Sequence, residues 1–184
     1  MRPLKVGDET MPFQQTPHTQ LYYAIFTPNL TAEVSDTKEV LLIHGFASTP
    51  EADFAKQLEA LRSRYRVIAP HLHGYGRSSH RESYSTTYYR EDVEDLITLL
   101  DALKIKQVLV LGFSDGAIVG LLLAALHPDR VKALAVLGAQ ATVNEEDVAG
   151  IRHWLLEEPL SKACRPNWLT CMENPTGAPC HLCL

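Results

Sequence analysis

Short apolar runs alternate along the chain with longer segments in which apolar residues recur every three or four positions. The runs with the composition of strands lie at 21–26, 39–43, 65–70, 107–111 and 131–137. Helical spacing links Phe54, Leu58 and Leu61, and a longer stripe extends from Tyr89 to Leu103. Continuously apolar strands are typical of buried parallel sheets. The pattern therefore predicts βαβ units of the α/β class, with a doubly wound, mostly parallel sheet and helices on both faces.

The pentapeptide Gly-Phe-Ser-Asp-Gly at 112–116 joins one of these strands to a helix. The helical segment 117–126 is apolar on every face, which predicts a helix covered on all sides. A G-x-S-x-G sequence at a strand-to-helix junction is a nucleophile elbow, which lifts a serine hydroxyl above the sheet. The helix N-terminus points N–H groups and a positive dipole at the reacting oxygen. Ser114 is therefore the candidate nucleophile; the alternative is a serine that only caps the helix.

A serine of this kind needs partners. Its hydroxyl is a weak nucleophile unless a histidine takes its proton and an acid orients that histidine. The oxyanion of a tetrahedral intermediate needs two N–H donors aimed at one point. The backbone N–H of Asp115, directly after the nucleophile, is the first candidate donor. The second should come from the loop that follows His44 and Gly45, which could instead be a plain strand-ending turn.

Composition and charge narrow the class of protein. The chain has 184 residues, 46% of them hydrophobic, and a formal net charge of −5. That length suits one domain with a substantial core. The negative charge and the lack of a Lys/Arg cluster argue against nucleic-acid binding. The N-terminus has no apolar signal region, and no run of 18 apolar residues could span a membrane, so we expect a cytoplasmic protein without membrane contact.

Three motifs together resemble the α/β-hydrolase fold family: residues 43–46, the segment 70–78, and the elbow at 112–116. Residues 113–116 and 138–147 are similar to the valacyclovir hydrolase (biphenyl hydrolase-like) branch, and the resemblance covers about residues 12 to 160. It implies serine-dependent hydrolysis of a small-molecule carboxylic ester through an acyl-enzyme on Ser114, with neither metal nor organic cofactor. It also implies that Phe46 supplies the second oxyanion-hole donor, with Asp115 as the first.

The resemblance assigns further roles around the elbow. The branch implies amine-bearing acyl esters, whose ammonium group could pair with the Asp115 carboxylate at the pocket mouth. The open alternative is that Asp115 only complements the positive helix N-terminus. His44 is expected to be a structural hydrogen-bonder, because the family delivers its base from a late loop. The family commonly has Asp after the proline of the second motif, where this chain has His71, so that contact must be replaced or absent.

The C-terminal part of the family pattern is missing. The family adds a lid and then two strands, whose loops carry the acid and the histidine. Here the lid begins with Thr142–Glu145, which resembles a capping box, and the pattern stops near Leu160. We therefore expect a hydrolase portion at 1–160, truncated after the sixth family strand and the start of the lid, and an irregular tail at 161–184. An out-of-frame or mis-spliced continuation would explain that tail.

The tail contains all the cysteines of the chain, namely Cys164, Cys171, Cys180 and Cys183. Their spacing gives only one tight pair where a structural zinc site normally has two, and disulfides are not expected without a secretory signal. His181 has no preceding strand to orient it as a base. Two functions therefore remain open: an ester hydrolase, or an inactive fragment or binding partner that self-associates through an exposed strand at 131–137. Thioesterases, lipases and carbon–carbon hydrolases share the elbow, whereas a dehalogenase would need Asp in place of Ser114.

Overall fold

The computed structural model describes residues 13–28 and 38–156. They form one six-stranded sheet with the strand order β1-β2-β4-β3-β5-β6. The strands are β1 (Phe13–Gln15), β2 (Gln20–Phe26), β3 (Glu39–Ile43), β4 (Arg66–Pro70), β5 (Val108–Phe113) and β6 (Val131–Leu137). Strands β4, β3, β5 and β6 are parallel, while β1 and β2 form an antiparallel extension. The predicted α/β class with a mostly parallel sheet is confirmed.

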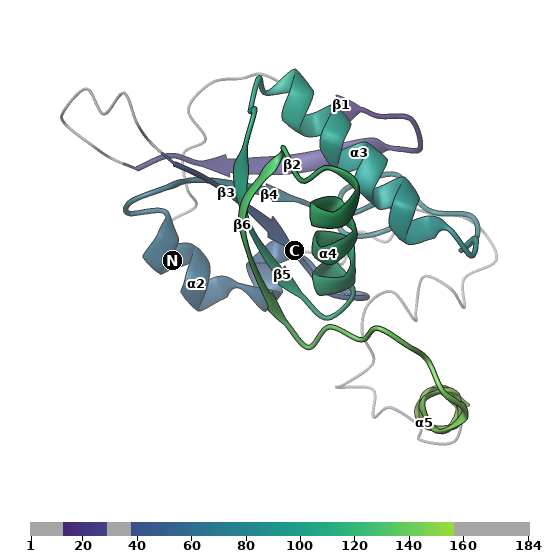
Figure 1. Ribbon diagram of the computed structural model, residues 1–184. Helices are drawn as coiled ribbons and strands as arrows, with labels where there is room; N and C mark the ends of the chain where they lie inside the picture. The colour runs from purple at the N-terminus through teal and green to yellow at the C-terminus, as the bar shows by residue number, and fades with distance from the viewer. Residues whose placement is uncertain (1–12, 29–37, 157–184) are drawn as a thin grey trace.

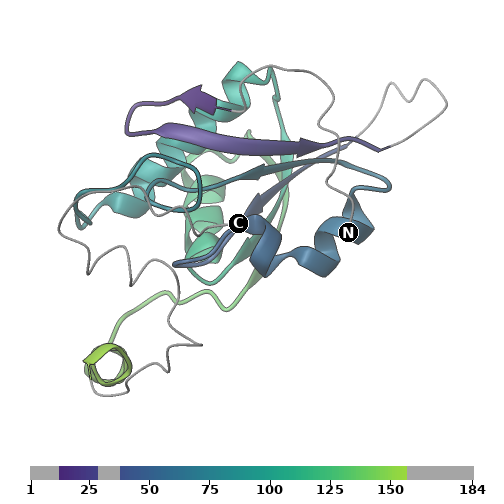
Figure 2. The same cartoon turned by 180° about the vertical axis from the view of Figure 1, so that it is seen from behind.

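Helices cover both faces of this sheet (Figures 1 and 2). The covering helices are α1 (Pro50–Asp53), α2 (Ala55–Leu61), α3 (Tyr88–Ala102) and α4 (Asp115–Leu126), and a further helix, α5 (Glu145–Leu156), follows β6. The side chains of β3 alternate between two cores, because neighbouring strand residues point to opposite faces. Leu41 and Ile43 join the larger core with α3 and α4, whereas Val40 and Leu42 join a smaller core with Phe54 and Leu58. Each βαβ crossover thus places its helix on one face.

Two predicted elements differ from the sequence pattern. The stripe of Phe54, Leu58 and Leu61 does not form one helix, because Phe54 leaves the helical conformation between α1 and α2 and packs into the smaller core. The helix α4 is not covered on all sides: Leu121 and Leu126 are exposed. Apolar composition reports how hydrophobic a segment is, but not how many neighbours cover it.

The helix α5 extends away from the sheet in Figure 1. Its predicted capping box begins two residues too early. Asn144 is the capping residue, since its Oδ1 accepts the Asp147 N–H at 2.9 Å and the Asp147 carboxylate accepts the Asn144 N–H at 2.9 Å. This is the reciprocal arrangement of a capping box. The predicted tail and its four cysteines lie outside the described residues.

The outer strand β6 pairs only with β5 in the part of the chain that the structure describes. The side chains of Ala133, Ala135, Val136 and Leu137 are exposed. An apolar edge of this kind is a template for pairing with another strand.

None of the helices in the described ranges has both the length and the apolar composition that a membrane span requires.

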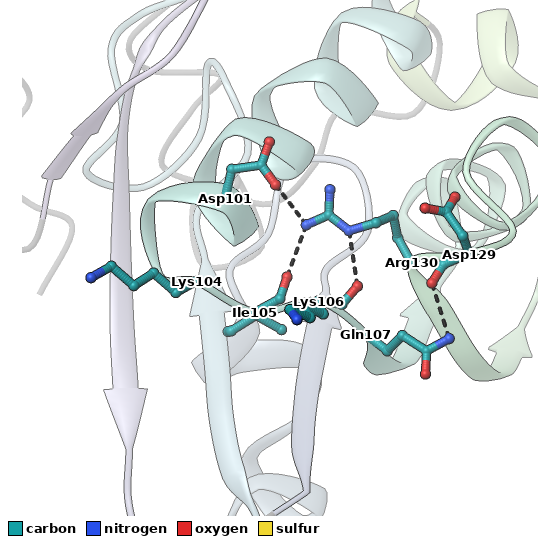
Figure 3. Close-up of a pocket in the computed structure, with 7 residues that line it drawn as sticks. All are labelled: Asp101, Lys104, Ile105, Lys106, Gln107, Asp129 and Arg130. Carbon is teal, nitrogen blue, oxygen red and sulfur yellow. Dashed lines mark hydrogen bonds and ion pairs between the residues drawn. The ribbon is translucent and has the colours of Figure 1, made fainter.

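The helix α3 ends in a Schellman motif beside a surface pocket at the amino end of β5 (Figure 3). The Ile105 N–H donates to the Leu100 carbonyl at 2.9 Å, and the Lys104 N–H donates to the Asp101 carbonyl at 3.0 Å. This pattern places Lys104 in the left-handed region, with φ 57°. Arg130 holds the next turn by donating to the carbonyls of Ile105 and Lys106. The pocket thus lies at the end of β5 opposite to Ser114.

Replacing Lys104 by glycine should stabilise the protein. Glycine adopts a positive φ without steric cost, and none of the interactions marked in Figure 3 involves the Lys104 side chain. We expect the free energy of unfolding to rise by about 0.5–1 kcal/mol. Urea denaturation followed by circular dichroism measures this change. As a control, Lys106→Gly should not stabilise, because Lys106 is not among the residues with positive φ.

Candidate active site

The carboxyl ends of β3 and β5 meet at the place where the strand order changes direction. From β3 the chain moves first to β4 on one side and then to β5 on the other. The register pairs Ile43 of β3 with Gly112 of β5, so the loops that follow these residues lie at the same level. Open α/β sheets bind ligands at such a switch point. The predicted oxyanion loop and the predicted nucleophile are therefore brought together.

Ser114 occupies a strained turn between β5 and α4. Its backbone has φ 53° and ψ −121°, which L-residues rarely adopt. Such strain costs of order 1–3 kcal/mol and persists only where the surroundings enforce it. Here the Ser114 N–H donates to the Leu137 carbonyl of β6 at 2.9 Å, and its carbonyl accepts the Ala117 N–H at 2.8 Å. Its hydroxyl makes no capping bond to the helix, which removes the alternative of a simple N-cap.

The two glycines of the pentapeptide allow the turn to form. A Cβ on Gly112 would lie 2.4 Å from the Gly116 carbonyl oxygen. A Cβ on Gly116 would lie 2.1 Å from the Ile43 carbonyl oxygen. Both distances are far below any real contact, and both partners are backbone atoms. Helix α4 can therefore start directly against the end of β3 only if these positions lack side chains.

The loop after β3 faces the serine. A Cβ on Gly45 would lie 3.1 Å from the Ser114 Cβ, so the two backbones approach closely here. The next residues turn sharply, with Ala47 at φ 54°. The Phe46 ring is 42% exposed and contacts the rings of Tyr75 and Tyr84. Asp115 is the first residue of α4, a position whose N–H has no intrahelical acceptor.

His44 is a buried structural residue, as predicted. Its Nε2 accepts the Leu72 N–H at 2.9 Å, which leaves the proton on Nδ1 to donate to the Gly45 carbonyl at 2.8 Å. Burial lowers its pKa to about 4, so the ring is neutral at physiological pH. With both ring nitrogens engaged and no exposed surface, His44 cannot act as the base for Ser114.

The Asp115 carboxylate points toward helix α3. It accepts a hydrogen bond from the Tyr88 hydroxyl at 3.3 Å. Burial raises the pKa of Asp115, against the lowering effect of the hydroxyls of Tyr89 and Tyr88. An aromatic cluster lies next to Tyr88. Ring centroids are 5.3–6.3 Å apart in the pairs Tyr84–Tyr88, Phe46–Tyr84 and Phe46–Tyr75, and the Tyr84 hydroxyl donates to the Tyr75 hydroxyl. A half-buried carboxylate therefore lies beside an aromatic cluster, one residue after the candidate nucleophile.

This geometry agrees with the comparison against known families. Residues 38–163 match the alpha/beta hydrolase fold family, which covers more than half of the chain. The chain belongs to the α/β hydrolase fold family. The predicted resemblance is thus confirmed, including its branch, because serine hydrolase BPHL is among the similar proteins.

Serine hydrolase BPHL of Mus musculus is 37% identical over 111 residues, which are 59% of this chain and 38% of that protein. An epoxide hydrolase of Caballeronia sordidicola is 38% identical over 116 residues, which are 61% of this chain and 35% of that protein. Among solved structures, a hydrolase from Pseudomonas aeruginosa PA01 has a TM-score of 0.66 at 26% identity, covering 79% of this chain and 52% of that one. The chain therefore spans well under half the length of these two sequence relatives.

His71 stands after Pro70, where the family resemblance predicts an aspartate, and both of its ring nitrogens have partners. His71 Nδ1 accepts the Arg77 N–H at 3.0 Å, which orders the glycine-rich loop. Its other nitrogen lies 3.1 Å from the Glu51 carboxylate. Burial opposes ionisation of Glu51, but the hydrogen bond and charge of His71 outweigh it and lower the pKa of Glu51 to about 2. The loop is thus held by a histidine–carboxylate pair.

Sequence reasoning missed two groups that shape this site. Asp53 accepts hydrogen bonds from the predicted oxyanion loop, and the Tyr88 hydroxyl donates to the Asp115 carboxylate. Asp53 is the last residue of the four-residue α1 and Tyr88 is the first residue of α3, so neither belongs to a helical stripe that could mark it in the sequence. The catalytic base is not brought to Ser114 by the described residues, since none of their histidines is hydrogen-bonded to the Ser114 hydroxyl. In the same ranges, no cluster of three or more His, Cys, Asp or Glu could hold a metal ion.

Proposed function

We propose that this chain carries the nucleophile of a serine hydrolase that acts on carboxylic esters. The strained backbone of Ser114, enforced by glycines at 112 and 116, is the observation that supports this most strongly. The Ser114 Oγ would attack the ester carbonyl, and a base would take the hydroxyl proton. The alcohol then leaves with that proton, and water hydrolyses the acyl-serine to release the acid.

The oxyanion of the tetrahedral intermediate would be bound by the backbone N–H groups of Asp115 and Phe46. The start of α4 beside Ser114 and the approach of Gly45 to the Ser114 Cβ support this assignment. Preorganised amide donors are worth about 2.7–4 kcal/mol each to such a transition state.

Ester hydrolysis fits a serine better than epoxide opening, although epoxide hydrolases are among the relatives. A serine that opened an epoxide would form an ether, which water cannot cleave by addition to a carbonyl. A serine that attacks an ester forms a new ester, which water can cleave. The identity of residue 114 therefore favours acyl transfer.

The substrate we propose carries an amine in its acyl part. The Asp115 carboxylate is half-buried beside Phe46, Tyr75, Tyr84 and Tyr88. An ammonium group there would gain a charge pair with Asp115 and contacts with aromatic faces. The hydrogen bond from the Tyr88 hydroxyl to the Asp115 carboxylate supports this role. The open alternative is that Asp115, in the first turn of α4, only complements the positive helix N-terminus.

A fluorophosphonate probe tests the nucleophile. The purified chain should become labelled with one equivalent of probe on the peptide that contains Ser114. Ser114→Ala should abolish labelling, and Ser63→Ala, at an exposed serine at the end of α2, should leave it unchanged. Ser114→Gly should also abolish labelling while raising the free energy of unfolding by about 1 kcal/mol, because glycine relieves the positive φ. An alkylammonium ion should slow labelling of the wild type but not of Asp115→Asn.

No labelling of the wild type would contradict the proposal. It would favour the alternative, an inactive chain that binds a partner or a second copy through β6. The exposed apolar residues of that edge strand are the observation in its favour. In that case sedimentation velocity should show a mass that rises with protein concentration.

A further inference from the structure

Asp53, the last residue of α1, is bonded to the loop that faces the nucleophile. One of its carboxylate oxygens accepts the Gly45 N–H at 2.8 Å, and the other accepts the Ser48 hydroxyl at 2.7 Å. The two contacts lie at the two ends of the tetrapeptide 45–48. The carboxylate therefore bridges the two ends of this loop.

The carbonyl group of Gly45 is held by His44. The Gly45 carbonyl accepts the proton of His44 Nδ1 at 2.8 Å, and His44 is itself fixed by the Leu72 N–H. Gly45 thus has its N–H bonded to Asp53 and its C=O bonded to His44. Together these two bonds determine the rotation of the Gly45 backbone, which would otherwise be the freest in the loop.

The orientation of Gly45 decides where the Phe46 N–H points. The Phe46 N–H and the Gly45 C=O belong to the same peptide group, which is planar and trans here, so they point in opposite directions. His44 draws that C=O toward the buried side of the loop. The Phe46 N–H is therefore turned away from His44. Gly45 itself would contact the Ser114 Cβ if it carried a side chain, so this peptide group lies beside the nucleophile.

We infer that Asp53 is a positioning residue of the oxyanion hole, which holds the Gly45–Phe46 peptide so that the Phe46 N–H points at the carbonyl attacked by Ser114. The inference rests on the proposed function. Asp53 does not touch substrate in this arrangement, because its two oxygens are committed to Gly45 and Ser48. A carboxylate is suited to this task, since bonds to an ionised acceptor are stronger than neutral ones and keep a flexible loop in one geometry.

The test compares full-length wild type with Asp53→Ala, Asp53→Asn and the control Glu59→Ala. Asparagine keeps one oxygen that can accept the Gly45 N–H, so Asp53→Asn should preserve the fold and part of the positioning of the Phe46 N–H. Glu59 is an exposed carboxylate on the neighbouring helix α2, where it pairs with Arg62 at 3.9 Å. The first measurement is the rate of Ser114 labelling by the fluorophosphonate probe. The second is the amide resonance and hydrogen-exchange rate of Gly45 and Phe46.

We expect the labelling rate to fall by about 10- to 100-fold in Asp53→Ala, which is less than the ~10²–10³-fold loss when an oxyanion donor is removed entirely. Asp53→Asn should lie between this variant and the wild type, and Glu59→Ala should match the wild type. The amide resonances of Gly45 and Phe46 should move in Asp53→Ala, with faster exchange at Gly45, while the resonances of β3 stay in place.

If Asp53 only stabilised the fold, Asp53→Ala would lower the free energy of unfolding but would change neither the labelling rate nor the Phe46 amide resonance. If Asp53→Ala keeps the wild-type labelling rate, or leaves the Phe46 amide where it is in the wild type, the inference is wrong. If the wild type is not labelled at all, the proposed function fails, and the inference is then decided by the Phe46 amide alone. The two failures are therefore distinguishable.

Discussion

Gly116→Ala should destabilise the protein by about 3 kcal/mol or more, although alanine is the better helix former. The added Cβ would lie 2.1 Å from the Ile43 carbonyl oxygen and 2.5 Å from the His44 carbonyl oxygen. Both are backbone atoms at the end of a central strand, so neither can rotate away. Either α4 must move off the sheet or β3 must bend. Relative to a typical margin of about 5–15 kcal/mol, this loss is large.

A second glycine of the same helix provides the control. A Cβ on Gly120 would meet the ends of two side chains, at 3.2 Å from Leu134 Cδ1 and 3.3 Å from Val110 Cγ1. Those groups can shift slightly, and the helix gains about 1 kcal/mol of propensity from alanine. We therefore expect Gly120→Ala to lie within about 1 kcal/mol of the wild type. Chemical denaturation of both variants measures the difference, and equal effects would show that the close approach at Gly116 is not the cause.

Arg81→Met should produce the other large effect. The Arg81 side chain is 2% exposed and pairs with the Asp92 carboxylate, which is 3% exposed, and with Glu91 at 2.9 Å. It also lies over the rings of Tyr84 and Tyr88. Removing it leaves Asp92 buried without its cation. Breaking a buried pair in this way costs about 3–5 kcal/mol.

This cost should depend on pH. Burial raises the pKa of Asp92 to about 7, against the lowering effect of Arg81. The folded state therefore binds this proton more tightly than the unfolded chain, where an aspartate has a pKa of about 3.9. The stability that the protonated form provides is fully present below about pH 4 and is lost as the pH rises through about 7. Without Arg81 the charged form of the Asp92 carboxylate has no cation beside it and is less stable in the folded protein. The free energy of unfolding that Arg81→Met removes should therefore be larger at about pH 8 than at about pH 5.

Two further variants make this prediction specific. Arg81→Met combined with Asp92→Asn should recover much of the stability, because no buried charge is left unpaired. Arg62→Met removes an arginine from the exposed pair with Glu59, and it should change stability by no more than about 0.5 kcal/mol. Thermal or urea unfolding across the pH range measures all of them. A pH-independent loss in Arg81→Met would contradict the role given to Asp92.

The sequence alone located the elements that build the candidate site. The runs before Gly112 and before His44 were continuous enough to predict buried parallel strands, and β5 and β3 lie there. The G-x-S-x-G spacing indicated the turn at Ser114, and its positive φ is found in the structure. These features depend on residues that are close together in the chain, so local patterns report them.

Other features depended on which segments meet. The β1–β2 hairpin contributes two antiparallel strands, one of them only three residues long, which is too short for a clear period. Phe54 continues a helical stripe in the sequence, yet it interrupts the helix to fill the smaller core. Leu121 and Leu126 are apolar in an apolar helix, and only the position of α4 in the sheet decides that they are exposed.

The sequence by itself determined the α/β architecture, the turn at Ser114 and the position of the loop that follows β3. Only the tertiary structure brought Asp53 to Gly45, Tyr88 to Asp115 and Arg81 to Asp92. The physical reason is that hydrophobic periodicity reflects which face of an element is buried, whereas a hydrogen bond or ion pair requires two particular atoms within about 3 Å. That distance is set by the packing of the whole sheet with its helices, and no local pattern records it.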